Sequence, residues 1–194
     1  MGYTLLQSFF GKGNTMFSLN DKVVYPGHGV ACIHRVFQKT VGTQVMVFYE
    51  LKFQSKDMTI MVPKEKMQEV GVRPISSNNL ISSMLETLTI PTRYVKSFET
   101  NSTNWNKRNK EYQSKLRTGS LQDISDIYRD LKYISRFKEL SFGEKNLLLK
   151  TEALLAEEIS AAEKVDAEKA IEKLRSPFVP FFTGSPSTTA SNTM

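Results

Sequence analysis

Short apolar runs fill the first part of the chain, between residues 17 and 73. Each run predicts a strand because β-branched and aromatic residues alternate with polar ones, and Gly, Pro or charged turns separate the runs. Pro63 ends the fourth run, since proline cannot continue a ladder. The connections are too short for a helical crossover, which predicts antiparallel strands in a small closed or half-closed β-barrel. The predicted strands are 22–25, 30–37, 44–53, 58–62 and 67–72.

The spacing becomes helical after residues 74–78, a Pro-Ile-Ser-Ser-Asn stretch that we interpret as a hinge. Apolar residues then recur at three- and four-residue intervals. Asn78 or Asn79 can cap the first helix, Gly119 ends the second, and Ser141 with Glu144 has the capping-box form. The predicted helices are about 79–88, 104–116, 120–134, 142–159 and 165–174.

These patterns predict an α+β protein in which a small β-barrel precedes an all-helical domain. Residues 1–16 have no clean period and are expected to be a flexible arm, so Met16 could be an alternative start. The tail is rich in Ser, Thr and Pro, which predicts disorder although it contains Phe178, Phe181 and Phe182. The predicted divisions are the arm 1–16, the barrel 17–73, the hinge 74–78, the helical domain 79–175 and the tail 176–194.

Composition excludes several classes of protein. None of the apolar runs in the 194 residues approaches the roughly 18 residues of a membrane span. The start of the chain lacks the basic residues of a signal peptide. The one cysteine, Cys32, cannot form an internal disulfide or a cysteine-based zinc module, and two histidines argue against a metal site. We therefore expect a cytoplasmic protein without a bound metal.

The net charge of +6 is unevenly distributed. Residues 93–138 carry 11 basic and 5 acidic side chains, whereas residues 139–194 carry 6 basic and 9 acidic ones. A focused positive field favours a polyanionic partner. A solvated helix face is an equally good interpretation of charge alone.

Recurring catalytic motifs are absent from the sequence, including the P-loop, the dinucleotide-binding glycines and the metalloprotease helix. Cys32 and His34 are two apart in a predicted strand, so both point to one face and could form a dyad. An unpaired strand cysteine is more often a small buried hydrophobe. We predict no catalytic residue, no cofactor and no enzymatic activity.

The most informative segment begins at Asn104 and contains the only tryptophan of the chain, Trp105. Basic residues follow on the same predicted helix and could neutralise phosphates without reading sequence. An exposed indole beside them could stack on a base or wedge into a minor-groove step. The alternative is that Trp105 packs in the helical core, where tryptophan usually lies. The basic residues are Lys107, Arg108, Lys110, Lys115 and Arg117.

The chain resembles the CarD/CdnL family of bacterial transcription regulators from Phe17 to about Leu174. The strand half carries DKVVYPGHGV from Asp21, MTIMVP from Met58 and VGVR from Val70. The helical half carries TNWNKR from Thr103 and LSFGEK from Leu140. Between them lie KL from Lys115, Gly119 and RDL from Arg129. The transcription-repair coupling factor shares the barrel pattern, but it does not share the tryptophan-containing half.

The resemblance implies a Tudor-like N-terminal domain that binds the β subunit of RNA polymerase. It also implies a helical domain that lies on promoter DNA at the upstream edge of the melted bubble, with no sequence preference. Trp105 would wedge into the minor groove, and Lys107, Arg108 and Lys110, with Lys115 further along, would hold the backbone. The implied effect is stabilisation of the open promoter complex.

The polymerase contact is expected on the fourth strand, where Met61 replaces an arginine of other family members. An edge strand could pair with the polymerase through its backbone, which tolerates side-chain change. Basic residues nearby, Arg73 among them, could supply charge. The expected contacts are Lys39, Lys52, Thr59, Ile60, Met61 and Pro63.

Two further hypotheses stay open. The chain could be a free-standing nucleic-acid-binding protein whose barrel is only structural, which predicts salt-dependent binding without polymerase. It could also be an enzyme that uses Cys32, which predicts loss of activity in Cys32→Ala. We expect a monomer located on the nucleoid through RNA polymerase.

Overall fold

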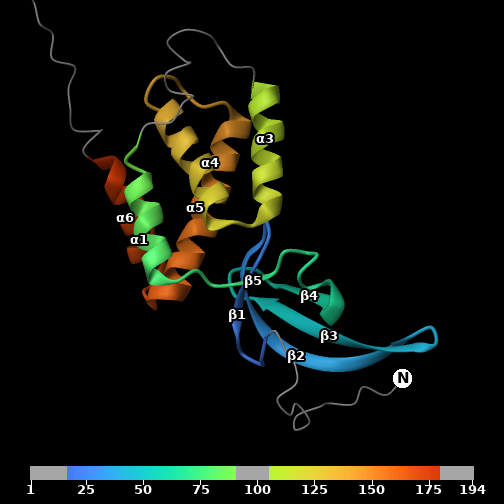
Figure 1. The fold of residues 1–194 in the computed structure, drawn as a ribbon. Helices are drawn as coiled ribbons and strands as arrows, with labels where there is room; N and C mark the ends of the chain where they lie inside the picture. Colours follow the sequence, from blue (N-terminus) through green and yellow to red (C-terminus); the bar gives the residue numbers. More distant parts are fainter. Residues whose placement is uncertain (1–16, 91–104, 180–194) are drawn as a thin grey trace, which may run out of the picture.

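The computed structural model describes residues 17–90 and 105–179, with a sheet at one end and helices at the other (Figure 1). The predicted arm 1–16, Thr103 and Asn104, and Phe181 and Phe182 of the predicted tail lie outside the described residues. The α+β arrangement, with the β domain preceding the helical domain, is confirmed.

Five antiparallel strands pair in the order β4-β3-β2-β1-β5. Within the described residues this is an open sheet with β4 and β5 at its edges, where a barrel was the expectation. Its core combines strand residues, among them Val23 and Leu51, with Phe17 from before β1 and Met67 from after β4. The strands are β1 (Lys22–Tyr25), β2 (Gly29–Val41), β3 (Gln44–Phe53), β4 (Met58–Pro63) and β5 (Arg73–Pro74).

The predicted strand 67–72 is wrong. Residues 67–71 form turns after the short 3-10 helix η1 (Lys64–Lys66), and the ladder resumes only at β5. Met67 and Val72 are buried, but they reach the core from a turn whose Gly71 has a φ of +83°. The apolar spacing was therefore a signal of burial and not of a strand.

The β2–β3 hairpin continues beyond the end of β4, which pairs only with Phe48–Phe53 of β3. The rest of the hairpin is a two-stranded ribbon that projects away from the helices (Figure 1). Phe37 and Phe48 stack across its base with ring centroids 5.9 Å apart.

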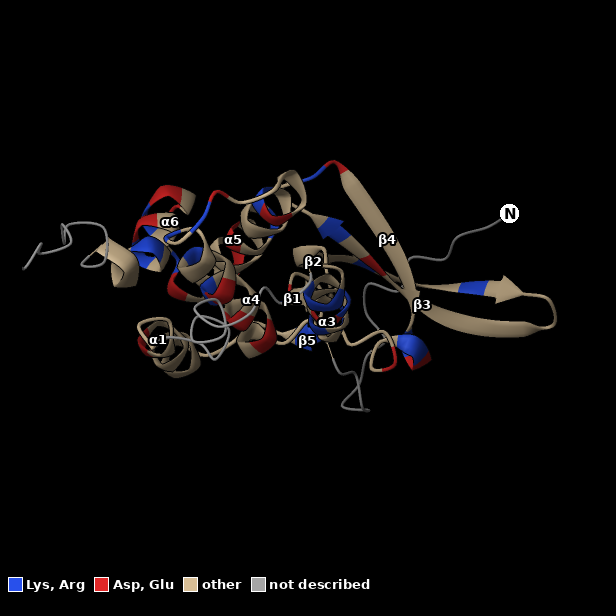
Figure 2. Ribbon diagram, turned by 90° about the horizontal axis from the view of Figure 1, so that it is seen from above, with Lys and Arg blue, Asp and Glu red and all other residues tan. Residues whose placement is uncertain are grey.

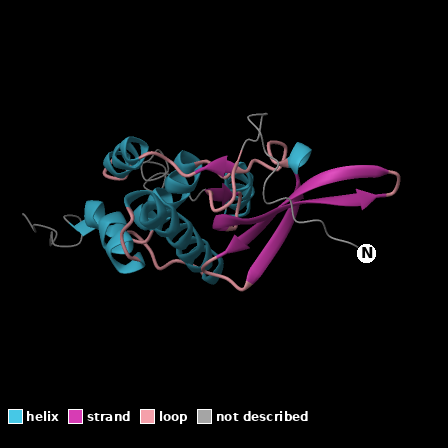
Figure 3. Ribbon diagram, turned by 90° about the horizontal axis from the view of Figure 1, so that it is seen from below, coloured by secondary structure: helices cyan, strands magenta, loops and turns pink. Residues whose placement is uncertain are grey.

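The helices lie together on one side of the sheet (Figure 3). Local capping explains where they begin: Ser77 caps α1, one residue before the expected cap, and Ser120 and Asp166 cap α4 and α6. The capping box of Ser141 and Glu144 opens α5, as predicted. The helices are α1 (Asn78–Thr87), α3 (Trp105–Thr118), α4 (Leu121–Ile134), α5 (Phe142–Glu163) and α6 (Ala167–Arg175).

The start of the predicted disordered tail is ordered. Residues Ser176–Phe178 form the 3-10 helix η2, and the Phe178 side chain is buried in the helical core. Its ring meets those of Tyr128 and Tyr133 edge-on, with centroids 5.7 and 6.0 Å away. The expectation of disorder from residue 176 onward is therefore wrong for these residues, because one aromatic side chain has a pocket in the core.

The predicted hinge 74–78 is tied to the helical domain. Arg73 meets the buried Glu158 of α5 through two hydrogen bonds, of 2.6 and 2.9 Å, and its Nε donates to the carbonyl of Gly119. Ser76 donates its hydroxyl and its amide to the same carboxylate. Arg73 is therefore used inside the molecule and does not supply the polymerase-facing charge that the sequence suggested.

The β1–β2 turn forms the other half of this joint. Pro26 packs against the α3–α4 turn, where a methyl group on Gly119 would lie 2.8 Å from its ring. The amide of Val30 donates to Glu157 of α5 over 3.1 Å. Two contacts on different strands thus fix the sheet against the helices, and a two-point attachment resists rotation better than a single linker.

Candidate nucleic-acid interface

Trp105 is the first residue of α3, and its side chain is partly buried. The indole packs against the helical core and lies over the start of α5, where a methyl group on Gly143 would be 3.2 Å from Cζ2. The structure therefore combines the two interpretations of the sequence: one part of the indole is anchored in the core, and the other is accessible.

Arg108 lies in the core beneath this site. Its side chain is 2% exposed, and its Nη2 donates to Oε1 of Glu144 over 2.8 Å, where Glu144 is 1% exposed. It shares the inward face of α3 with Tyr112 and Leu116. The expectation that Arg108 holds a DNA phosphate does not fit this placement, because its guanidinium is turned away from solvent.

Glu144 joins three elements at this point. Its carboxylate accepts hydrogen bonds from Ser141, closing the capping box, and from Lys138 and Arg108. Burial alone raises the pKa of Glu144, but the hydrogen bonds from Ser141 and Lys138 outweigh burial and lower it. The charged form is therefore favoured, and it anchors the start of α5 against Trp105 and Arg108.

Three cations line the outer face of α3. Lys107, Lys110 and Arg117 are exposed and lie three and seven residues apart, which places them along one side of the helix. Figure 2 shows α3 nearly end-on, with all of its Lys and Arg positions in blue. Lys115 points elsewhere, to α4, where it pairs with Asp126 over 3.0 Å. Arg117 therefore takes the outward place that the sequence had given to Lys115.

The predicted polymerase contacts do not share one surface. Thr59 and Met61 are exposed on β4, and Thr59 is the register partner of Lys52, so these three share the outer face of the sheet edge. Ile60 points to the core face. Lys39 lies apart on the projecting ribbon, opposite Met46.

Pro63 ends the β4 edge as predicted. Because β4 is the last strand of the sheet order, its outer backbone groups are not used in a ladder within the described residues. Such an edge is a template for pairing with another strand.

Cys32 and His34 both lie on β2, at an irregularity in its pairing with β3. The Cys32 thiol contacts the carbonyl of Ile33 at 3.9 Å, and the strand register shifts between Ile33 and Arg35, around His34. Both side chains line a surface hollow of about 540 Å³ that also contains Lys52 and Lys56. Among residues 17–90 and 105–179, no group of three His, Cys, Asp or Glu side chains is placed to hold a metal ion.

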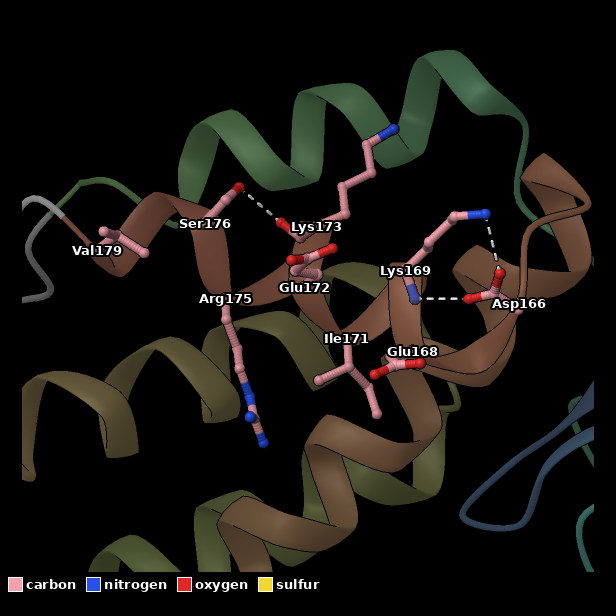
Figure 4. A pocket seen from close by; sticks show the side chains of 9 residues that line it. All are labelled: Asp166, Glu168, Lys169, Ile171, Glu172, Lys173, Arg175, Ser176 and Val179. Carbon is pink, nitrogen blue, oxygen red and sulfur yellow. Dashed lines mark hydrogen bonds and ion pairs between the residues drawn. The ribbon is translucent and has the colours of Figure 1, made fainter.

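A larger surface groove, of about 1020 Å³, runs along α6 (Figure 4). Its polar side chains already have partners: Lys169 pairs with Asp166, Lys173 pairs with Glu163 of α5, and Ser176 donates to the carbonyl of Lys173. Figure 4 shows Arg175 directed away from Lys173, and Arg175 binds Glu152 of α5. The groove therefore has no convergent set of polar groups.

None of the described helices is both long and apolar enough to cross a membrane.

Both halves of the chain match known domains. Residues 17–76 match the CarD-like/TRCF RID domain, an RNA-polymerase-interacting domain, and residues 94–175 match the CarD C-terminal domain. An RNA-polymerase-interacting sheet domain joined to this helical domain defines a class of transcription factors. The chain belongs to the CarD family of transcription regulators.

A relative in Bacillus subtilis (strain 168) is named "Putative transcription factor YdeB". It is 25% identical to this chain over 137 residues, which cover 69% of this chain and 83% of that protein. The similarity thus extends over most of both proteins.

Proposed function

We propose that this protein binds the β subunit of RNA polymerase through the β4 edge and stabilises the open promoter complex through α3. The exposed cationic face of α3, which begins at the partly buried Trp105, carries the proposal. The protein would act as a monomer in the cytoplasm, on promoter DNA and without sequence preference.

The indole suits a wedge because only part of it is anchored. A side chain that enters a base step of intact duplex must unstack it, at a cost of a few kcal/mol. At the upstream edge of a bubble the stack is already interrupted, so the same side chain binds at lower cost. Trp105 would then bind the melted state more tightly than the closed state, and only such a difference shifts the equilibrium between them.

Lys107, Lys110 and Arg117 supply the affinity that does not depend on sequence. Each cation that neutralises a phosphate releases a counterion, so three contacts on duplex DNA give a salt slope of about −2.7. Affinity of this kind is weak alone. Attachment to the polymerase raises the local concentration of the helical domain near the promoter, so weak contacts suffice.

The β4 edge offers the polymerase a backbone surface. Pairing with an edge strand of the β subunit would use main-chain hydrogen bonds, with Thr59, Met61 and Lys52 beside the new strand. Backbone pairing explains how Met61 can stand where other family members have an arginine. Met61→Glu is expected to weaken polymerase binding, because it puts a carboxylate where the native edge carries an apolar side chain and its relatives a cation.

The test is the lifetime of the open complex formed by the cognate polymerase on a labelled promoter, challenged with competitor DNA. Wild type is expected to lengthen the lifetime, whereas Trp105→Ala should give the lifetime seen without the protein. Lys107→Ala with Lys110→Ala should shorten it and reduce its salt dependence. Lys169→Ala, which removes an exposed cation on α6, is the matched control and should behave as wild type.

Two results contradict the proposal. If Trp105→Ala lengthens the lifetime as wild type does, the wedge is wrong. If wild type has no effect on the lifetime but binds duplex DNA alone with a salt slope near −2.7, the chain is a free-standing nucleic-acid-binding protein.

A further inference from the structure

Residues 135–142 join α4 to α5, include the first residue of α5 and are called the α4–α5 connector; they present two phenylalanines to solvent. Phe142 is 82% exposed and Phe137 is 55% exposed, and only four residues separate them. A scattered exposed apolar side chain is ordinary, but two large aromatic side chains in one short connector are an unusual use of surface.

The connector lies beside the tryptophan of the proposed DNA site. Phe142 is the first residue of α5 and directly precedes Gly143, the residue over which the Trp105 indole packs. Side chains at the start of a helix lean toward its N-terminus, so Phe142 lies at the end of α5 against which the Trp105 indole packs.

Cations lie close to these phenylalanines in the sequence. Arg136, Lys138 and Lys145 are exposed on the same connector and first turn. Two of these cations have carboxylate partners, Lys138 with the buried Glu144 and Lys145 with Glu139, and their side chains remain 41% and 51% exposed. Exposed aromatic rings interleaved with basic residues are the pattern of surfaces that bind single-stranded nucleic acid.

We propose that the α4–α5 connector binds unpaired DNA, with Phe142 stacking on a nucleotide that the melted bubble leaves next to the Trp105 wedge and Phe137 supporting the same strand. This inference rests on the proposed function, because it places the connector at the bubble edge. Duplex DNA is the poorer ligand, since its bases are stacked on each other and offer no free face to a phenylalanine. The contact is tolerant of sequence because every base has a π-face.

The experiment uses the full-length protein with fork-junction DNA, which has a duplex arm and a single-stranded extension, and with the matching blunt duplex. Phe142→Ala should weaken binding to the fork by about five- to 150-fold, the range for loss of one stacked base, and leave binding to the duplex unchanged. Phe137→Ala should have a smaller effect in the same direction. Leu149→Ala is the matched control, because Leu149 is 62% exposed on α5 and follows Phe142 by seven residues.

A photocrosslink locates the contact directly. The fork carries 5-iodouracil at its first unpaired position, in a complex with the cognate polymerase, and the crosslinked peptide is identified by mass spectrometry. The peptide that contains Phe142 should be recovered from wild type and Leu149→Ala and lost from Phe142→Ala.

Several results overturn the inference. Wild type and Phe142→Ala could bind the fork with equal affinity, or the variant could lose as much affinity for the duplex as for the fork. The crosslinks could also be confined to the peptide that contains Trp105. Weaker polymerase binding by Phe142→Ala without DNA would show a protein contact instead. If wild type lengthens the open-complex lifetime while Phe142→Ala leaves fork binding unchanged, only this inference fails. If wild type has no effect on the lifetime, the proposed function fails, whatever Phe142 does.

Discussion

Replacement of Arg108 tests whether this residue stabilises the core of the helical domain or binds DNA. In Arg108→Ala the carboxylate of Glu144 loses its fully buried cation, at 2.8 Å, and keeps only Ser141 and the partly exposed Lys138 as partners. Breaking a buried ion pair from one side costs about 3–5 kcal/mol. For a chain of this size, 1 kcal/mol shifts Tm by about 2–4 °C, so Tm should fall by about 6–20 °C.

The assay is chemical and thermal unfolding of wild type, Arg108→Ala and Lys110→Ala, followed by circular dichroism. Lys110→Ala removes an exposed cation from the same helix and should change stability by less than about 0.5 kcal/mol. In the double variant Arg108→Met with Glu144→Gln, the loss should be smaller than the sum of the single losses, because neither partner is left as a buried charge. Near-wild-type stability of Arg108→Ala with reduced DNA binding would refute the reasoning and return Arg108 to the DNA surface.

Three further predictions concern stability. The pKa of Glu144 is lowered in the folded state, so its contribution is present above the ordinary glutamate pKa and lost as pH falls; the stability difference between wild type and Glu144→Gln should shrink between about pH 5 and pH 3 in urea titrations. Phe178→Ala should cost about 3–5 kcal/mol in denaturant unfolding, whereas the exposed neighbour Val179→Ala should cost less than about 0.5, and equal effects would contradict the core role of Phe178. Gly119→Ala and Gly42→Ala both put a methyl group at positive φ, but only the first meets the proline of the β1–β2 turn, so Gly119→Ala should lose about 1–3 kcal/mol more in the same assay, and equal losses would show that this contact contributes nothing.

Local signals allowed much of the fold to be predicted. The first residue of α5 follows from a serine and a glutamate three positions apart, and the start of α4 from Ser120. These features depend on neighbouring residues, so the sequence contains them in full. The turn at 67–71 could not be predicted in this way, because Met67 is buried through contacts with strands distant in the sequence.

The site was predicted only in part for the same reason. Trp105, Arg108, Tyr112 and Leu116 share the inward face of α3, and this spacing was a signal that Arg108 points inward. The type of residue suggested phosphate binding instead. Its true partner, Glu144, is 36 residues away, so the pairing depends on how α3 and α5 pack. The exposure of Phe142 likewise depends on packing, and the spacing of apolar residues in the sequence does not predict it.

The ion pair between Arg73 and Glu158 fixes the distance between the sheet and the helices. If one end is held on the polymerase and the other carries the wedge, the distance between them is set by the protein and cannot adjust freely to the promoter. One base pair along a duplex is about 3.4 Å, a step that a stiff two-point joint resists and a loose linker would absorb. The protein would then respond to where a bubble begins as well as to whether it exists, so promoters that differ by a single melted pair upstream would differ in their response. A looser joint would let the helices reach bubbles at more positions, and the protein would then discriminate less between promoters.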